Sequence, residues 1–567
     1  MINRYVVIAF VVLSRLVSPA GGYYRLANEG KPGLNMFSMN RILTLDEEDI
    51  DLGTAALLLS REWGTRRTFH AYRNKMDDMA QEIIGRLEKN RIGKDQRAIP
   101  VINEFLFDEL GFKSVETADD PEDLFLHTVI DERRGYCLSL SVLYLALAER
   151  IGLPMYGVVV PGHFFVRYDD GNKQYNIETT SRGGMAPDKH YLEKFKPPET
   201  PETVYMKNLT KRQTLGCFFN NLGNSYSAVG EIDTAIYELE RAVSINPSLT
   251  EAHTNLGNMY LKKGWAQDAI EQYMLGLNVI SDDPKAHYNL ANAYSQTGRF
   301  KDAILEYKKA KELQDDFVEA YRNMANVYRK QKIFSKAILE LKTAISIEPD
   351  DSETYRVLGD VYREMGQYSS AIAQYRKALK IEPDSVSANI SLAYGYMQSG
   401  KLEEAVAQFI IAISLDPSEA GAYFGLATAY NKLGRTDDEI DTYLDMLAIE
   451  PGMGAALQNL GNAYVSKKMY SDAAEIYLRA IEIEPANSQL YYNMGVAYAN
   501  MELYEQGAQW YRNAIELDGK NGAAHHGLAI SYYMLKEYDQ AHHHIGVAKE
   551  LGFEVNKELV EAIGKKL

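Results

Sequence analysis

The sequence is poor in cysteine, in long apolar runs and in positive charge. Its 567 residues include two cysteines, Cys137 and Cys217, too few for a disulfide framework and with no Cys-x-x-Cys pair for zinc. It has no apolar run of about 18 residues, the length that a membrane-spanning helix needs. The 61 basic residues are outnumbered by 78 acidic ones, giving a net charge of −17. This charge argues against nucleic acid as a partner, because phosphate binding requires an excess of Lys and Arg.

The first twenty residues have the three parts of a secretory signal. Arg4 provides a basic start, Val6 to Leu13 is apolar, and Ser18 to Ala20 supplies small residues for cleavage. An uncleaved anchor and a buried first strand are the alternatives. We expect residues 1–20 to be a signal peptide and the protein to be exported, to the periplasm or outside the cell. Without a working signal the protein is cytoplasmic, and removal of the signal leaves no integral membrane segment.

Tyrosine is abundant, with 40 Tyr against 18 Phe, and the excess comes from a repeat. Steps of 34 residues from Gly223 reach ten positions, ending at Ala529, that are all Gly or Ala. A tyrosine follows three residues after each of them, from Tyr226 to Tyr532. Small residues allow two helix axes to approach closely, and we expect the tyrosine to fill the gap beside them. Each unit is therefore predicted to be a pair of antiparallel helices.

This pattern resembles the tetratricopeptide repeat (TPR) in its period and in its small, Tyr, Ala and Pro positions. The match covers residues 216–555, predicted to form ten units, and residues 556–567 are predicted to be a helix that caps the last unit. In a TPR array the first helix of each unit lines a concave groove. The resemblance implies that this groove binds protein or peptide partners.

Asparagine recurs on the predicted groove face, although it is a mediocre helix former. Its carboxamide both donates and accepts hydrogen bonds, which suits the main chain of an extended peptide. The pattern resembles the TPR superhelix of the O-GlcNAc transferases, and hydrogen bonding between units is the alternative. Two residues before the small position stand Asn221, Asn255, Asn289, Asn323, Asn459 and Asn493. One residue after it stand Asn224, Asn258, Asn292, Asn326 and Asn462.

Four arginines fall on the same predicted face in the fourth and fifth units. They are Arg322, Arg329, Arg356 and Arg363. Guanidinium groups on an inner face suit a clamp for carboxylates, and pairing with acidic residues of neighbouring helices is the alternative. The last unit contains five of the eleven histidines, but adjacent histidines on a helix point to different faces. We therefore expect no metal site, and no cofactor.

The region before the array is predicted to be an α+β domain over residues 23–186. Residues 187–215 are predicted to be a linker and the helix that leads into the array. A buried helix is predicted from Leu138 to Ile151, with Cys137 at its start. A cysteine at a helix N-terminus feels the positive end of the helix dipole, which favours the reactive thiolate. Cys217 is predicted to be structural.

A hairpin is predicted after this helix. A strand over Met155–Val160 leads to a second strand from His163, and Asp170-Gly171 predicts a two-residue turn. In that register the numbers of opposed residues sum to 341, so His163 faces Glu178. A carboxylate beside imidazole fixes its tautomer and leaves the other ring nitrogen for a thiol. Cys137, His163 and Glu178 are thus a candidate catalytic group.

Two stretches resemble the transglutaminase-like, papain-like superfamily, and most nearly the SirB1 N-terminal branch. They are R-R-G-Y-C-L-S-L-S-V-L-Y-L-A-L-A-E-R-I-G-L-P and P-G-H-F-F-V-R. The resemblance covers residues 50–185 and implies that Cys137 is the nucleophile, His163 the general base and Glu178 the acid, where the family usually has Asp.

The predicted fold class is an α+β transglutaminase-like domain followed by an all-α TPR superhelix. Two functions stay open. In the first, a TPR scaffold binds extended polypeptides and its Cys-His-Glu domain cleaves or transfers amide acyl groups. In the second, the domain is inactive and the protein is a non-enzymatic scaffold.

Overall fold

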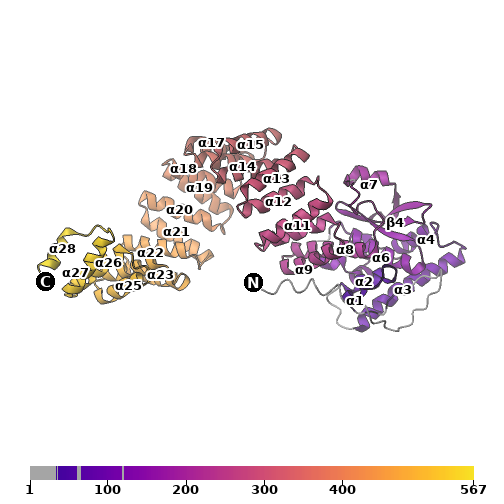
Figure 1. Cartoon of the computed structure of the whole chain (residues 1–567), viewed down its shortest axis with the longest axis horizontal. Coiled ribbons are helices and arrows are strands. Elements are labelled where there is room, and N and C mark those ends of the chain that lie inside the picture. The colour runs from indigo at the N-terminus through magenta and orange to yellow at the C-terminus, as the bar shows by residue number, and fades with distance from the viewer. Residues whose placement is uncertain are drawn as a thin grey trace. The chain divides into compact units, whose positions relative to one another are not determined.

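The computed structural model describes residues 33–34, 36, 38–59, 66–117, 120–198 and 200–566. It divides into two compact units, the first ending at Gln314 and the second beginning at Asp315. Figure 1 labels the elements along the chain. The first unit holds the front domain and three helix pairs, and the second holds seven pairs and a final helix. This architecture confirms the predicted fold class. The predicted signal peptide lies outside the described residues.

Helix α6 (Cys137–Ile151) is the central element of the front domain. Fourteen of its fifteen residues are buried, because apolar side chains occupy every turn. Gly152 ends it with a left-handed backbone, φ 88°, as predicted. It packs on α3 (Arg66–Lys89) and against the sheet. The smaller elements of the domain are α1 (Met39–Ile42), η2 (Glu47–Asp49), α2 (Leu52–Leu58), α4 (Ala98–Asn103), η3 (Glu104–Glu109), η4 (Pro121–Leu124), α5 (Leu126–Glu132) and η5 (Thr179–Ser181).

The main sheet is antiparallel and has the strand order β3-β4-β5-β6. Its strands are β3 (Met155–Val160), β4 (His163–Asp169), β5 (Gln174–Glu178) and β6 (Gly184–Ala186). A separate parallel pair joins β1 (Lys113–Ser114) to β2 (Arg134–Gly135). The faces of β3 and β4 that meet α6 are apolar, so the core of the domain lies between this helix and the sheet.

The hairpin between β4 and β5 differs from its predicted register by two residues. Val166 pairs with Ile177 and Asp169 with Gln174, so the predicted two-residue turn is wrong. The carboxylate of Asp170 accepts from the Asn172 and Lys173 N–H groups, both at 2.8 Å, and this makes a longer turn. A shift of two residues keeps every side chain on its face.

The segment predicted as a linker contains a helix, α7 (Asp188–Phe195). Tyr191 of this helix is fully buried and its ring stacks on Phe165 of β4 at a centroid distance of 3.9 Å. Arg167 of β4 donates to the Asp188 carboxylate at 2.8 Å. This part of the predicted linker therefore belongs to the front domain.

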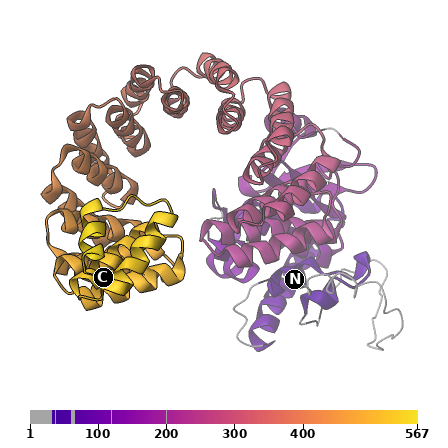
Figure 2. The ribbon, with the colours of Figure 1, turned by 60° about the vertical axis from the view of Figure 1, so that its left-hand side comes forward.

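The repeat forms the ten predicted helix pairs, and Figure 2 shows them stacked one after another within each unit. The first helices are α8 (Lys211–Ala228), α10 (Thr250–Lys262), α12 (Pro284–Gln296), α14 (Val318–Lys330), α16 (Ser352–Glu364), α18 (Val386–Gln398), α20 (Ala420–Leu433), α22 (Gly454–Ser466), α24 (Ser488–Asn500) and α26 (Gly522–Met534). The second helices are α9 (Ile232–Ile245), α11 (Ala266–Val279), α13 (Phe300–Leu313), α15 (Phe334–Ile347), α17 (Tyr368–Ile381), α19 (Leu402–Leu415), α21 (Thr436–Ile449), α23 (Tyr470–Ile483), α25 (Tyr504–Leu517) and α27 (Tyr538–Glu550).

At several small positions the small residue lies against a ring from the second helix. A Cβ added to Gly257 would lie 2.6 Å from the ring of Tyr273, and one added to Gly495 would lie 2.6 Å from Tyr511. The ring that fills this gap is thus 16 residues along the chain, and the expected tyrosine three residues along does not fill it. That tyrosine is also buried, as at Tyr260.

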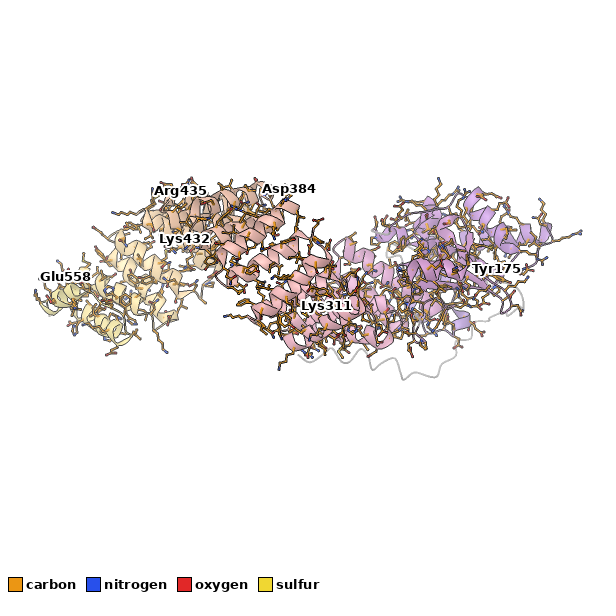
Figure 3. All side chains as sticks on the ribbon, turned by 90° about the horizontal axis from the view of Figure 1, so that it is seen from above. Tyr175, Lys311, Asp384, Lys432, Arg435 and Glu558 are labelled. Carbon is orange, nitrogen blue, oxygen red and sulfur yellow. The ribbon has the colours of Figure 1, made fainter. Side chains whose placement is uncertain are left out.

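The last helix, α28 (Lys557–Gly564), packs against α27 as the predicted cap. Asn556 caps it by accepting from the N–H of Glu558 at 2.8 Å; Glu558 is labelled in Figure 3. Ile563 is its buried contact. In the part of the chain that the structure describes, no helix combines the length and the apolar character needed to cross a membrane.

Candidate active site

Cys137 is the first residue of α6, as predicted, and only 5% of it is exposed. The Tyr136 N–H before it donates to Ser139 Oγ at 2.9 Å, which fixes the start of the helix. The first N–H groups of an α-helix have no partner within the helix, and they carry the positive end of its dipole. The thiol therefore lies where backbone donors favour negative charge.

His163 is the first residue of β4 and meets Glu178 at the end of β5. Its Nε2 lies 3.1 Å from both carboxylate oxygens, so the predicted contact is confirmed although the register differs. The imidazole stacks on Phe195 of α7, with ring centroids 5.2 Å apart and planes 2° apart. Because Nε2 is engaged by Glu178, Nδ1 is the nitrogen left for a thiol.

The pKa of His163 depends on burial of its ring and on two neighbours, Cys137 and Glu178. Burial disfavours the charged imidazole, but hydrogen bonding to Cys137 and to Glu178 outweighs burial and raises the pKa of His163 to about 9. The structure thus joins the imidazole directly to the Glu178 carboxylate, and the Cys137 thiol lines the same cavity as the imidazole. An imidazole so placed is held as imidazolium at neutral pH.

Glu178 is held by more than the imidazole. The Tyr191 hydroxyl donates to Oε1 at 2.6 Å, and the Thr180 hydroxyl donates to Oε2 at 3.1 Å. Burial works to raise the pKa of Glu178, but the hydrogen bonds from His163 and Tyr191 outweigh it, so the pKa lies below its ordinary value. The carboxylate stays ionised and orients the ring.

Sequence reasoning missed three residues of this site, Thr180, Tyr191 and Phe195. Two of them lie on α7, in the segment interpreted as a linker. The available signal was the spacing of Tyr191 and Phe195, four residues apart and so on one face of a helix.

Cys137 and His163 line a cavity of about 320 Å³ whose other wall is made by α8 and α10 of the first two TPR units. Cys217 of α8 lines it too and is 2% exposed. Burial and the nearby Glu251 raise the pKa of the Cys217 thiol. The two cysteines thus have different surroundings, although they border the same space.

The asparagines of the groove face bond largely to the array itself. Asn255 donates to Asn220 of the preceding unit at 2.9 Å, and Asn493 donates to Asn462 at 3.1 Å. Asn221 donates to the Cys217 carbonyl at 3.0 Å. Equivalent half-buried positions on α12, α14 and α22 hold Asn289, Asn323 and Asn459. Hydrogen bonding between units therefore accounts for Asn255 and Asn493, whereas Asn221 bonds within its own helix.

The second set of asparagines, which stand one residue after the small position, accepts hydrogen bonds from tyrosines of the second helices. Hydroxyl groups donate to carboxamide oxygens in three units, each time across 15 residues. The pairs are Tyr273 with Asn258 at 2.7 Å, Tyr307 with Asn292, and Tyr477 with Asn462 at 2.7 Å. These bonds join the two helices of one unit.

The four arginines are paired with acidic residues. Arg322 lies 2.6 Å from Asp351, and Arg329 lies 2.6 Å from Glu364. Arg356 pairs with Glu353 and with Asp360 at 2.8 Å, and Arg363 lies 3.7 Å from Asp360. Pairing with acidic residues of a neighbouring helix thus accounts for Arg322 and Arg329, whereas Arg356 and Arg363 pair within α16. We propose no carboxylate clamp.

Histidines of the last unit contact one another. The Nδ1 atoms of His525 and His544 are 2.9 Å apart, and burial together with His525 lowers the pKa of His544 to about 4. Among the described residues, no three His, Cys, Asp or Glu side chains are grouped to hold a metal ion.

Comparison with known families gives the class of each part. Residues 70–216 match the model described as transglutaminase-like superfamily. Residues 223–264, 292–332, 359–398 and 461–502 match a TPR repeat, and residues 390–456 and 488–521 match tetratricopeptide repeats. The chain combines a transglutaminase-like domain with a TPR array.

Curated relatives are similar over part of the chain. A UPF0162 protein of Xylella fastidiosa (strain Temecula1) is 27% identical over 233 residues. The match covers 38% of this chain and 78% of the length of that relative. F-box only protein 21 of Mus musculus is 34% identical over 76 residues, 13% of this chain and 12% of its own. The UPF0162 similarity is consistent with a fusion of the SirB1 type.

Two solved TPR structures are similar to segments of the array. The crystal structure of MamA is 27% identical, covers 30% of this chain and 94% of its own, and has a TM-score of 0.29. YrrB, described as a TPR protein with an unusual peptide-binding site, is 22% identical, covers 33% of this chain and 97% of its own, and has a TM-score of 0.27.

Proposed function

We propose that this protein is a thiol-dependent acyl hydrolase or acyl transferase whose TPR array recruits its polypeptide substrate. The observation that carries the proposal is the hydrogen bond between His163 and Glu178. Cys137 also contributes to raising the pKa of the imidazole. An imidazole coupled to a carboxylate on one side and a thiol on the other is the arrangement that activates a cysteine nucleophile.

The reaction follows from these groups. His163 holds the proton that the Cys137 thiol gives up, and the sulfur attacks an amide carbonyl carbon, so that a C–S bond forms. The C–N bond then breaks, and the amine leaves with the proton from His163. Water or a second amine attacks the thioester, His163 takes the attacking group's proton and returns it to sulfur, and the free thiol is restored. Backbone N–H groups at the start of α6 are suited to stabilise the oxyanion.

The test compares the alkylation rate of Cys137 with that of Cys217, which serves as the internal reference. In the native protein Cys137 should be alkylated by iodoacetamide well below pH 8 and faster than Cys217, as measured by peptide mass spectrometry. His163→Ala should slow the reaction of Cys137 and leave that of Cys217 unchanged. Equal, slow alkylation of both thiols would contradict the proposal.

A non-enzymatic scaffold is the second candidate, and the near-complete burial of Cys137 is the observation that favours it. In that case the Cys137 thiol is a buried packing group of the domain, and only the array has a function. If the protein is a scaffold, we expect the two cysteines to be alkylated slowly and at equal rates.

A further inference from the structure

The cavity at Cys137 is shared between the front domain and the array. One wall carries Cys137 and His163, and the facing wall carries Asn224 of α8 with Glu251 and Asn255 of α10. Any group that reaches the thiol through this cavity therefore also meets the first two TPR units.

The connection that leads into the array holds this second wall in place. It covers the free edge of β3, where the Met206 N–H donates to the Val159 carbonyl at 3.1 Å. In the first turn of α8, Lys211 forms an ion pair with Glu149 of α6. Helix α8 is thereby tied to the helix that carries the thiol, so the two walls form one site.

The array wall presents carboxamides to the cavity. Asn224 is exposed, and Asn255 uses its Nδ2 to bind Asn220 while its carbonyl oxygen is available as an acceptor. Carboxamides accept from N–H and donate to C=O groups. This wall therefore suits the main chain of an extended polypeptide.

Glu251 adds a charge preference to the same wall. Its Oε2 atom is shielded from solvent and has no hydrogen-bond partner among the described residues, and burial raises the pKa of the carboxyl. The residues that line the cavity, all of them described, include no Lys or Arg. The Tyr205 hydroxyl hydrogen-bonds to the Glu251 carboxyl, so Oε2 is the oxygen left without a partner. A buried polar atom without a partner is costly, and a cationic group of a ligand relieves that cost by pairing with it.

We propose that α8 and α10 form the substrate-selecting wall of the Cys137 site, which takes an extended polypeptide with a basic side chain beside the reacting carbonyl. Asn224 and Asn255 hold the main chain, and Glu251 pairs with the ammonium or guanidinium group. This inference rests on the proposed function, since it needs Cys137 to react with the bound chain.

The test uses three tripeptide vinyl sulfones that differ only in the residue beside the electrophile: Lys, norleucine or Glu. The thiolate adds to the vinyl carbon and a proton from His163 or water completes the adduct, so no leaving group or oxidant is needed. Intact-protein mass spectrometry gives the labelling rate. The native protein should react about tenfold faster with the Lys probe than with the norleucine probe, and slowest with the Glu probe.

Variants assign this preference to the array wall. Glu251→Gln should bring the Lys-to-norleucine ratio close to one, and the iodoacetamide rate of Cys137, measured in the same variant, serves as the reference for the reactivity of the thiol. Asn255→Ala should slow all three peptide probes severalfold. Asn289→Ala is the matched control, because it stands at the same position one unit along and does not line the cavity; it should change none of the rates.

Two results would overturn the inference while the proposed function stands. They are equal labelling by the Lys and norleucine probes in a native protein whose Cys137 reacts readily with iodoacetamide, and an undiminished Lys preference in Glu251→Gln. A Cys137 that is inert to iodoacetamide as well as to the probes contradicts the proposed function instead.

Discussion

Two opposing influences, burial and hydrogen bonding, set the pKa of His163. Burial of the ring disfavours imidazolium, whereas Cys137 and Glu178 stabilise it by hydrogen bonding. Glu178 remains available for this because Tyr191 and Thr180 also donate to it. The behaviour of the site on titration is therefore set by side chains from α6, β4, β5 and α7 together.

Removal of the thiol should change the pKa of His163. In Cys137→Ala the burial of the ring remains while one of the two stabilising hydrogen bonds is lost, so the pKa should fall below 9. The Cε1 shift of His163, followed by NMR against pH, measures it. Cys217→Ala removes the other thiol of the cavity and should leave the titration unchanged. An unaltered pKa in Cys137→Ala would show that the thiol does not act on the ring.

The His163–Glu178 pair should make stability depend on pH. The folded pKa of His163, about 9, is above the ordinary 6.5, so its contribution is complete below pH 6.5 and is lost as pH rises to 9. The pKa of Glu178 is below the ordinary 4.5, so its contribution is present above pH 4.5 and is lost in stronger acid. The melting temperature of the native protein should exceed that of His163→Gln most between these limits. A constant difference from pH 5 to pH 9 would contradict this.

At the scale of elements, several helix pairs depend on small residues that face a ring of the second helix. Tyr511 of α25 is a clear case, because Gly495 of α24 and Gly527 of α26 face it from both sides. A Cβ at Gly495 would lie 2.6 Å from the ring and one at Gly527 would lie 2.5 Å from it. The ring consequently has little room to move in either direction.

Gly527→Ala should destabilise the last unit by about 1–3 kcal/mol, since the added methyl displaces the Tyr511 ring. The matched control is Gly546→Ala on the next helix, where an added Cβ meets nothing within 4 Å. That control should stabilise by about 0.5–1 kcal/mol, because Ala is the better helix former. Urea unfolding followed by circular dichroism measures both. Equal effects of the two changes would show that the ring contact is not the cause.

At the scale of the molecule, the first compact unit joins the front domain to three helix pairs. The joint is polar. Lys211 of α8 pairs with Glu149 and donates to the Ile50 carbonyl, and the Leu209 N–H donates to the Gly157 carbonyl at 2.9 Å. A candidate site that uses both parts depends on this joint.

Lys211→Met should loosen the joint by about 1–3 kcal/mol, because it leaves the shielded Glu149 carboxylate without its cation. Hydrogen exchange should then speed up at the Met206 and Leu209 amides, as measured by mass spectrometry. Lys189→Met is the control: its ion pair with Glu193 is exposed, with side chains 80% and 68% accessible, and should matter little. Unchanged exchange in Lys211→Met would show that the ion pair does not hold the parts together.

Sequence alone determined the parts of this protein that depend on local periodicity. The 34-residue repeat predicted the ten helix pairs, because each unit carries its own small, tyrosine and turn residues. The apolar run after Cys137 predicted α6, and the two strand-like runs that follow it predicted β3 and β4. The meeting of His163 with Glu178 was also predictable, since a two-residue error in register leaves both residues on the same face.

Tertiary structure alone decided what surrounds the thiol. Tyr191 and Phe195 reach Glu178 and His163 because α7 folds back on the sheet, and nothing in the local pattern of a proline-rich segment specifies that contact. The same holds for Glu251 and Asn255, which stand more than a hundred residues from Cys137 in the sequence. Side-chain periodicity reports the face on which a residue lies, whereas the partner of that face is set by packing between distant elements.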